Sequence, residues 1–497
     1  MEIRQVIASL IASLSLVASG MSLGFPAISL TELKNSDNLT DDESSWFASV
    51  VSLSQVVGCL LCGPLLDTFG RRITLMVINT PFIIGYIIMC SLPQPAPLAL
   101  LFLGRVLTGV ASGMVSIPAC VYIGEMATDS KRGMLVTWPS IGMSTGILLV
   151  YILGLGIKND WRLVAGITIA LPALSSILTF IYLKETSKWL ISRGRLSEAE
   201  KSFRWIREIG SDVKMPEQLD LEFQQLLANT KRVGQINDEA PSISTISNIM
   251  EEKPTMFAAK KESCCSKACS SVASLGSVDT WKPLVIHNFY FFFMQFGGIQ
   301  VVASYAVEIM ESAGVQLDLY IATVLLGTVQ LLGGIGASIA FNKCGRRPVS
   351  LISGTGMALT MIGLGVYQEL NDGSTELSWL PLVLILAYIG LAAIGFNLIP
   401  WGLLGELYPT RVAGLAGGLT TCLANVMGFA AIKLYPGFED SLKGDSERTG
   451  GGFFFFGAVA CVGTVFVFVF LPETFKKSLK QIGDEFSQPG LGKLRCC

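Results

Sequence analysis

The stretch that decides the fold is Gly63-Pro-Leu-Leu-Asp67-Thr-Phe-Gly70-Arg71-Arg72. Its last three residues are repeated in the second half of the chain as Gly345-Arg346-Arg347. Each copy of the motif lies at the C-terminal end of an apolar run. Two further patterns recur in the same order: residues 125–133 resemble residues 406–414, and Lys184-Glu185-Thr186 resembles Pro472-Glu473-Thr474. Three ordered matches indicate a chain built from two parallel repeats, an organisation typical of membrane transporters.

Twelve apolar runs surround these motifs, and each is about 20 residues or longer, enough to cross a bilayer as a helix. They cover approximately residues 6–30, 46–69, 73–92, 98–123, 133–156, 161–183, 283–307, 317–341, 348–368, 378–404, 412–434 and 451–471. Only 15% of the residues are charged, against roughly a quarter in soluble domains. We therefore predict an all-α polytopic membrane protein whose 12 transmembrane helices form two six-helix bundles. The first run is expected to be a retained helix rather than a cleaved signal peptide.

The predicted domains are an N-terminal bundle (1–183), a cytoplasmic linker with short helices and then a flexible segment (184–281), a C-terminal bundle (282–475) and a cytoplasmic tail (476–497). Lys and Arg gather in the loops after runs 2, 4, 8 and 10, which predicts that both termini are cytoplasmic. A glycosylation acceptor at Asn38 falls in the first outside loop and agrees with this orientation. The plasma membrane is the expected location.

The repeated charges are candidates for a gating network at the cytoplasmic face. Arginine suits a bidentate pair with a carboxylate, and such pairs could lock the two halves together and release when the inside opens. The network is expected to contain Asp67, Arg71, Arg72, Arg105, Glu125, Arg132, Arg346, Arg347 and Glu406. The alternative is that these residues only fix topology and helix ends.

These motifs together resemble those of the sugar porter family of the major facilitator superfamily. The residues 63–72, Gly104-Arg105, Glu125 through Arg132, Pro400-Trp401 with Glu406, and Pro472-Glu473-Thr474 carry the resemblance, which covers almost the whole chain. Within the family the sequence is most similar to the insect facilitated trehalose and glucose transporters. The resemblance implies the major facilitator fold and a sugar site between the two halves.

The implied sugar site consists of Gln295, Gln300, Gln330, Trp401 and Ser140. Amides both donate to and accept from sugar hydroxyls, and an aromatic ring suits the C–H face of a sugar. Gln295 and Gln300 lie about 140° apart on a regular helix, so both can face one ligand only if Gly297-Gly298 unwinds the helix. The alternative for each glutamine is a hydrogen bond between helices, and Trp401 could be a packing residue.

Ser22 stands where proton-coupled relatives have an aspartate, and residues 6–30 contain no Asp, Glu or His. This favours a facilitative sugar carrier working by alternating access; a proton-coupled symporter and a non-transporting sugar sensor stay open as alternatives. An enzyme is disfavoured because the chain has a single His and no Cys/His/carboxylate cluster. A net charge of −2 without a basic stripe disfavours nucleic-acid binding.

We expect no cofactor, metal or obligate protein partner; the expected partners are the sugar and the lipid bilayer. Which sugar is carried is left open by the sequence. Cys264, Cys265, Cys269, Cys496 and Cys497 are candidates for lipidation or, alternatively, incidental cytosolic cysteines.

Overall fold

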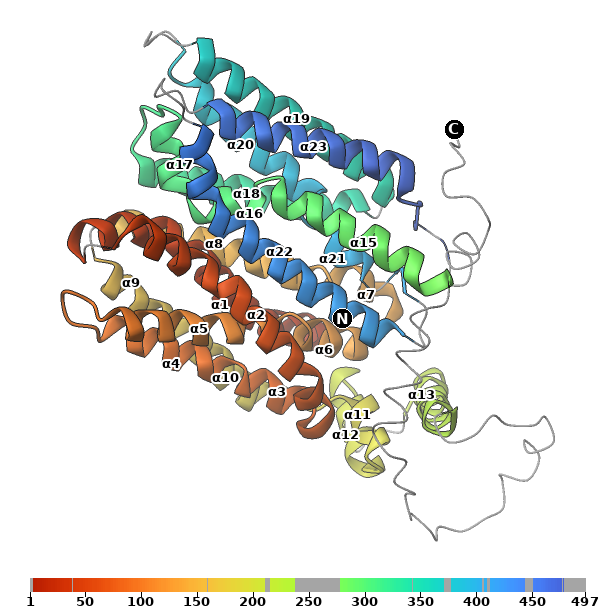
Figure 1. The fold of residues 1–497 in the computed structure, drawn as a ribbon. Coiled ribbons are helices and arrows are strands. Elements are labelled where there is room, and N and C mark those ends of the chain that lie inside the picture. Colours follow the sequence, from red (N-terminus) through yellow and green to blue (C-terminus); the bar gives the residue numbers. More distant parts are fainter. Residues whose placement is uncertain are drawn as a thin grey trace.

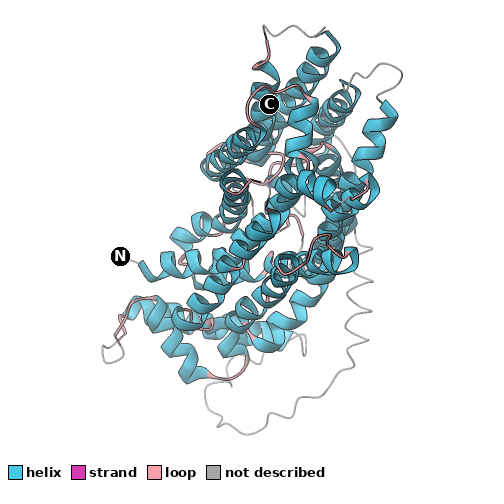
Figure 2. Ribbon diagram, turned by 90° about the vertical axis from the view of Figure 1, so that its left-hand side faces the viewer, coloured by secondary structure: helices cyan, strands magenta, loops and turns pink. Residues whose placement is uncertain are grey.

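The computed structural model describes residues 3–37, 39–158, 160–210, 215–236, 278–341, 343–370, 377–404, 406–408, 412–442, 450–475 and 477. Within these ranges every regular element is a helix (Figure 2). The predicted glycosylation site Asn38 and the five candidate lipidation cysteines lie outside the described residues, as does most of the linker after residue 236.

The first half of the chain contributes ten helices among the described residues, and all but α7 belong to its six candidate membrane spans; Figure 1 shows their arrangement. They are α1 (Ile3–Ser36), α2 (Asp41–Phe69), α3 (Arg71–Val77), α4 (Asn79–Cys90), α5 (Leu98–Val115), α6 (Pro118–Met126), α7 (Asp129–Leu135), α8 (Trp138–Gly156), α9 (Trp161–Thr168) and α10 (Ala170–Tyr182). Local sequence sets the ends of α2. Thr40 and Glu43 form a reciprocal capping box at its start, and Gly70 ends it with a positive φ of 86°.

The second half repeats this arrangement with α15 (Val278–Phe296), α16 (Ile299–Ser304), α17 (Ala306–Ser312), α18 (Leu319–Phe341), α19 (Arg346–Leu370), α20 (Leu380–Ile394), α21 (Ile399–Leu403), α22 (Ala413–Leu442) and α23 (Gly450–Phe470). The two halves meet where α2 packs along α22 and α8 along α18.

Eleven candidate spans among the described residues are long and apolar enough to cross a membrane. They correspond to eleven of the twelve predicted runs. The remaining run, 283–307, is divided among α15, α16 and α17, because the helix breaks at Gly297 and Gly298. The prediction of an all-helical membrane protein is confirmed, and the seventh crossing is a discontinuous helix.

Three helices between the halves, α11 (Ser187–Ser192), α12 (Leu196–Ile206) and α13 (Glu217–Ile236), lie beyond one end of the first bundle (Figure 1). Leu190, Phe203 and Phe223 belong to their own small apolar core. We call this end of the molecule, which also carries Arg71 and Arg346, the motif end. The other end is called the opposite end.

Candidate functional site

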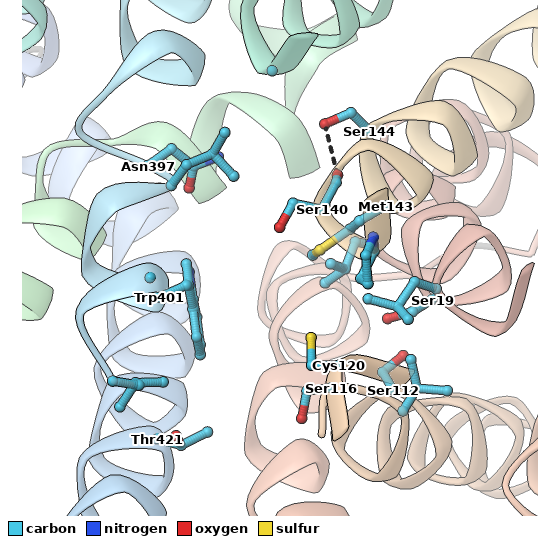
Figure 3. A pocket seen from close by; sticks show the side chains of 18 of the residues that line it. Ser19, Ser112, Ser116, Cys120, Ser140, Met143, Ser144, Asn397, Trp401 and Thr421 are labelled. Carbon is cyan, nitrogen blue, oxygen red and sulfur yellow. Dashed lines mark hydrogen bonds between the residues drawn. The ribbon is translucent and has the colours of Figure 1, made fainter. Parts of the chain in front are cut away.

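A cavity of about 800 Å³ lies between the two halves. Its first-half wall comes from α1, α2, α5, α6 and α8, and its second-half wall from α15, α16, α18, α21 and α22. Figure 3 shows Asn397, Trp401 and Thr421 on one side of this space and a row of small polar side chains on the other. The cavity reaches the motif end, because Arg132, which is exposed, and Arg346 and Glu406 also line it.

The broken helix brings both glutamines of span 7 to the cavity. Gly298 has a φ of 92°, and a Cβ built on it would lie 2.8 Å from the ring of Phe456, so this position requires glycine. The chain changes direction there, and Gln295 on α15 and Gln300 on α16 both line the cavity. Gln295 donates from Nε2 to the carbonyl of Ala424 at 3.1 Å. Its Oε1 is buried without a hydrogen-bond partner among the described residues.

The other three predicted sugar contacts also line the cavity. Gln330 is 7% exposed, and its Oε1 likewise has no partner in the described part of the chain. Trp401 is half-buried and packs edge-on against Phe291, with ring centroids 4.9 Å apart. Ser140 projects from α8 toward Trp401 across the cavity (Figure 3). Both glutamines therefore line the cavity, and each keeps a buried amide oxygen without a hydrogen-bond partner among the described residues.

Sequence reasoning missed most of the first-half wall, which is built from short hydroxyl and thiol side chains. The missed polar residues on this wall include Ser19, Ser52, Gln55, Cys59, Ser112, Ser116, Cys120 and Ser144. The second half adds Asn397, Thr421 and Asn425. The available signal was the spacing of Ser112, Ser116 and Cys120, which recur every four residues and so share a helix face.

At the motif end, Arg71 and Glu125 form a bidentate ion pair, with Nε–Oε2 3.1 Å and Nη2–Oε1 2.9 Å. Glu185, which the repeat contained but the predicted network did not, accepts the backbone N–H groups of Arg71 and Arg72 at 2.9 and 3.0 Å. Thr186 donates to Glu125 at 2.6 Å. The carboxylate of Glu185 approaches so closely that a Cβ on Gly70 would lie 2.4 Å from Oε2.

The second half repeats this cluster residue for residue. Arg346 pairs with Glu406 at 2.7 Å, and Thr474 donates to Glu406 at 2.7 Å. Glu473 accepts the backbone N–H groups of Arg346 and Arg347 at 3.0 and 3.1 Å. The Arg71 pair and the Arg346 pair each join helices within one half. In this structure they therefore brace each half internally, and the expected lock between the halves at this end stays a prediction.

The remaining members of the predicted network have separate surroundings. The guanidinium groups of Arg72 and Arg347 donate to the carbonyls of Phe180 and Phe468. Asp67 is exposed, and its backbone carbonyl accepts Nε1–H of Trp189 at 3.2 Å. Arg105 is absent from the motif-end clusters: it lies near the start of α5 at the opposite end, fully buried, and donates to the carbonyls of Ser22 and Phe47.

The opposite end carries ion pairs that do connect the two halves. Lys34 contacts Glu308 at 3.0 Å, and Lys158 contacts Asp318 at 2.6 Å. A third pair joins Lys433 of α22 to Asp42 of α2. In this structure the halves are therefore held together at the opposite end, and the cavity extends to the motif end.

The only histidine, His287 on α15, lies behind Trp401 and connects three helices. Its Nε2 lies 2.8 Å from the carbonyl of Pro400 and must donate, since a carbonyl only accepts. Its Nδ1 lies 3.0 Å from the hydroxyl of Tyr408, which is 2.7 Å from Thr420 Oγ1 on α22. His287 thus positions α21, the short helix that carries Trp401.

The comparisons with known proteins agree with this architecture. A family model described as sugar (and other) transporter matches residues 17–486. A facilitated trehalose transporter Tret1 of Culex quinquefasciatus is 30% identical over 96% of this chain and 85% of its own length. Its counterpart from Anopheles gambiae is 29% identical over 96% of this chain, which spans only 55% of that relative.

Solved structures of the proton:xylose symporter XylE have the same fold. One, bound to 6-bromo-6-deoxy-D-glucose, superposes with a TM-score of 0.73 at 20% identity, covering 97% of this chain and 98% of the other. An inward-open structure of XylE from E. coli gives a TM-score of 0.72 at 19% identity, covering 96% and 98% of the two chains.

Proposed function

Because the chain belongs to the sugar transporter family of the major facilitator superfamily, we propose that it is a facilitative carrier of a hexose or of trehalose. The observation that carries this proposal is the cavity between the halves, which is lined by Gln295 and Gln330, two residues whose amide oxygens have no hydrogen-bond partner among the described residues. A volume of about 800 Å³ falls in the range of roughly 300–1,000 Å³ common for small-molecule sites.

In the proposed cycle the sugar binds between the amides of the second half and the serines of the first. Gln295, Gln300 and Gln330 hydrogen-bond its hydroxyls, Trp401 stacks on a C–H face, and Ser140 contacts it from α8. The proposed orientation puts both termini and the motif end on the cytoplasmic side of the plasma membrane, so that the cavity is open toward the cytoplasm. Breaking the three ion pairs at the opposite end opens the other side.

Passive transport is favoured over proton coupling by the composition of α1. Residues 6–30 contain no carboxylate or imidazole side chain. The backbone carbonyl of Ser22 accepts a hydrogen bond from the buried guanidinium of Arg105. An intramembrane acid is the usual proton carrier. The symporter alternative predicts that an imposed pH gradient drives sugar accumulation against its own gradient, whereas a facilitative carrier only equilibrates it.

The test is counterflow of labelled glucose and labelled trehalose in proteoliposomes without an ion gradient. We expect saturable exchange of at least one sugar, lost in the Gln295→Ala and Trp401→Ala variants. Gln368→Ala is the matched control, because the Gln368 amide donates to the Ser312 carbonyl at 3.4 Å and does not line the cavity. If the folded protein binds sugar but shows no counterflow, the sensor hypothesis replaces the carrier hypothesis. If the folded protein neither binds nor transports glucose or trehalose, its substrate lies outside these sugars.

A further inference from the structure

The segment α16, which carries Gln300, is a helix of six residues between two breaks in span 7. A helix shorter than about 12 residues is marginal on its own, so contacts with neighbouring helices have to fix its place. Gln300 is half-buried and lines the cavity, and the other five residues of α16 are buried. Whatever holds α16 therefore also sets where the Gln300 amide lies.

A tyrosine hydroxyl donates to a backbone carbonyl at each of the two breaks. The last carbonyls of a helix have no partner inside it, and leaving a buried carbonyl unpaired is costly. At the first break the carbonyl of Gly297 accepts the hydroxyl of Tyr388 on α20, within the second half. At the second break the carbonyl of Ala303 accepts the hydroxyl of Tyr151 at 2.8 Å. Tyr151 is on α8, so this second bond comes from the first half.

Tyr151 is packed into the boundary between the two halves, and its side chain is fully buried. A Cβ built on Gly24 of α1 would lie 3.2 Å from Cε1 of the ring, and a Cβ built on Gly327 of α18 would lie 3.0 Å from Cδ2. The two glycines thus leave the space that the ring occupies, because a close-packed interior has no room for both a Cβ and the ring. The ring is held between one helix of each half, and it does not line the cavity.

We propose that Tyr151 is a positioning residue for the sugar site: it holds α16 from the first half and so keeps Gln300 directed into the cavity. The inference rests on the proposed function, because it treats Gln300 as a sugar contact. Tyr151 acts through the backbone of α16 and does not touch the sugar. Gln295 precedes the first break, on α15, so its place does not depend on this bond. Removing the Tyr151 hydroxyl weakens the Gln300 contact and leaves that of Gln295.

The first test does not involve sugar. Hydrogen–deuterium exchange of the purified full-length protein is measured by mass spectrometry on peptides that cover residues 297–305. We expect the amides of α16 to exchange about fivefold faster in Tyr151→Phe, which keeps the ring and removes one hydrogen bond. Tyr122→Phe is the matched control, since Tyr122 is a fully buried tyrosine on α6 whose hydroxyl donates to the Lys184 carbonyl at 2.9 Å. Unchanged exchange of α16 in Tyr151→Phe, or an equal rise in Tyr122→Phe, would overturn the proposal.

The second test is equilibrium binding of labelled glucose and labelled trehalose to the same variants. We expect Tyr151→Phe to raise the dissociation constant of the bound sugar about fivefold, and Tyr122→Phe to leave it unchanged. In a Gln300→Ala background, Tyr151→Phe should have no further effect, since the residue that it positions is gone. An equal loss in both backgrounds would reveal a general structural role and contradict the assignment. If the wild type binds neither sugar, the proposed function and the role of Gln300 are both overturned, while the exchange measurement still decides whether Tyr151 holds α16.

Discussion

Replacing Lys433 by methionine removes an ammonium group that joins the two halves at the opposite end while keeping an unbranched side chain. In the structure this group pairs with Asp42, donates to Ser45 Oγ at 2.7 Å, and lies 4.9 Å from the ring centroid of Trp46. All three partners are on α2, whereas Lys433 is on α22. The substitution therefore weakens only the state in which this end is closed.

The size of the expected effect follows from the solvent exposure of the ion pair. The Asp42 side chain is 77% exposed, so solvent screens the ion pair and holds its contribution to about 0.2–1 kcal/mol. The cation–π contact with Trp46 adds about 0.5 kcal/mol at such a site. A total of about 1 kcal/mol corresponds to a roughly fivefold change in the equilibrium between the two states. We expect the population open at the opposite end to increase by that factor.

The assay is alkylation of Cys120, which projects into the cavity (Figure 3), by a membrane-impermeant maleimide added outside cells and read by mass spectrometry. External reagent reaches Cys120 only when the opposite end opens, so its labelling rate should rise about fivefold in Lys433→Met. Asp42→Asn should give a smaller rise, because it leaves the contacts of Lys433 with Ser45 and Trp46, and the double variant should label at the rate of Lys433→Met, because the ion pair is already lost there.

Two control variants make the result specific. Lys433→Arg keeps both the charge and the aromatic contact and should label at the wild-type rate. Lys343→Met changes an exposed lysine at the motif end and should also have no effect. Unchanged labelling in folded Lys433→Met would refute the idea that this ion pair holds the halves together, and so would an equal rise in Lys433→Arg.

Three further substitutions test the local architecture by thermal unfolding of the purified protein. Gly70→Ala should cost about 1–3 kcal/mol, since φ is 86° and the Cβ would meet a carboxylate oxygen at 2.4 Å; Gly63→Ala, whose Cβ meets nothing within 4 Å, should cost nothing measurable. His287→Phe should cost about 1–3 kcal/mol, because the buried carbonyl of Pro400 loses its imidazole donor while the Tyr408 hydroxyl keeps only Thr420, and Tyr408→Phe should cost less. Burial raises the pKa of the Glu185 carboxyl above its ordinary value, so the folded state binds this proton more tightly than the unfolded state does. The free energy of unfolding should therefore increase as the pH falls through the raised folded-state pKa to the ordinary value, and Glu185→Gln should remove this dependence.

The crossings could be predicted because the membrane imposes a local rule. An apolar run of about 20 residues indicates a membrane span without any knowledge of the tertiary structure. The repeated Gly-Arg-Arg motifs indicated that the two halves of the chain correspond to each other. Even the break in span 7 had a local signal, since two adjacent glycines separate Gln295 from Gln300. The five predicted sugar contacts all line the cavity, although their role in binding stays a prediction.

The features that were missed depend on which helices meet. Serines are common in membrane helices, so the spacing of Ser112, Ser116 and Cys120 indicated one shared face but not whether that face meets a cavity or a neighbouring helix. Arg105 belongs to a recognised motif, and assigning it to the cytoplasmic network followed the motif rather than its depth in α5. The inter-half pairs of Lys34, Lys158 and Lys433 join segments that are between 160 and 391 residues apart in the sequence, and no spacing rule connects them.

The two sets of ion pairs differ in a way that fits a carrier made of two rigid halves. The motif-end pairs of Arg71 and Arg346 are supported by capping glutamates and threonines and lie within single halves, so rocking of the halves leaves them intact. The pairs between the halves are simple, partly exposed contacts whose individual contributions are small. In the proposed carrier cycle, contacts that form and break once per turnover have to be weak, because a strong lock at either end would trap the protein in one state. This distribution places the stability inside each half and leaves the interface between them nearly balanced.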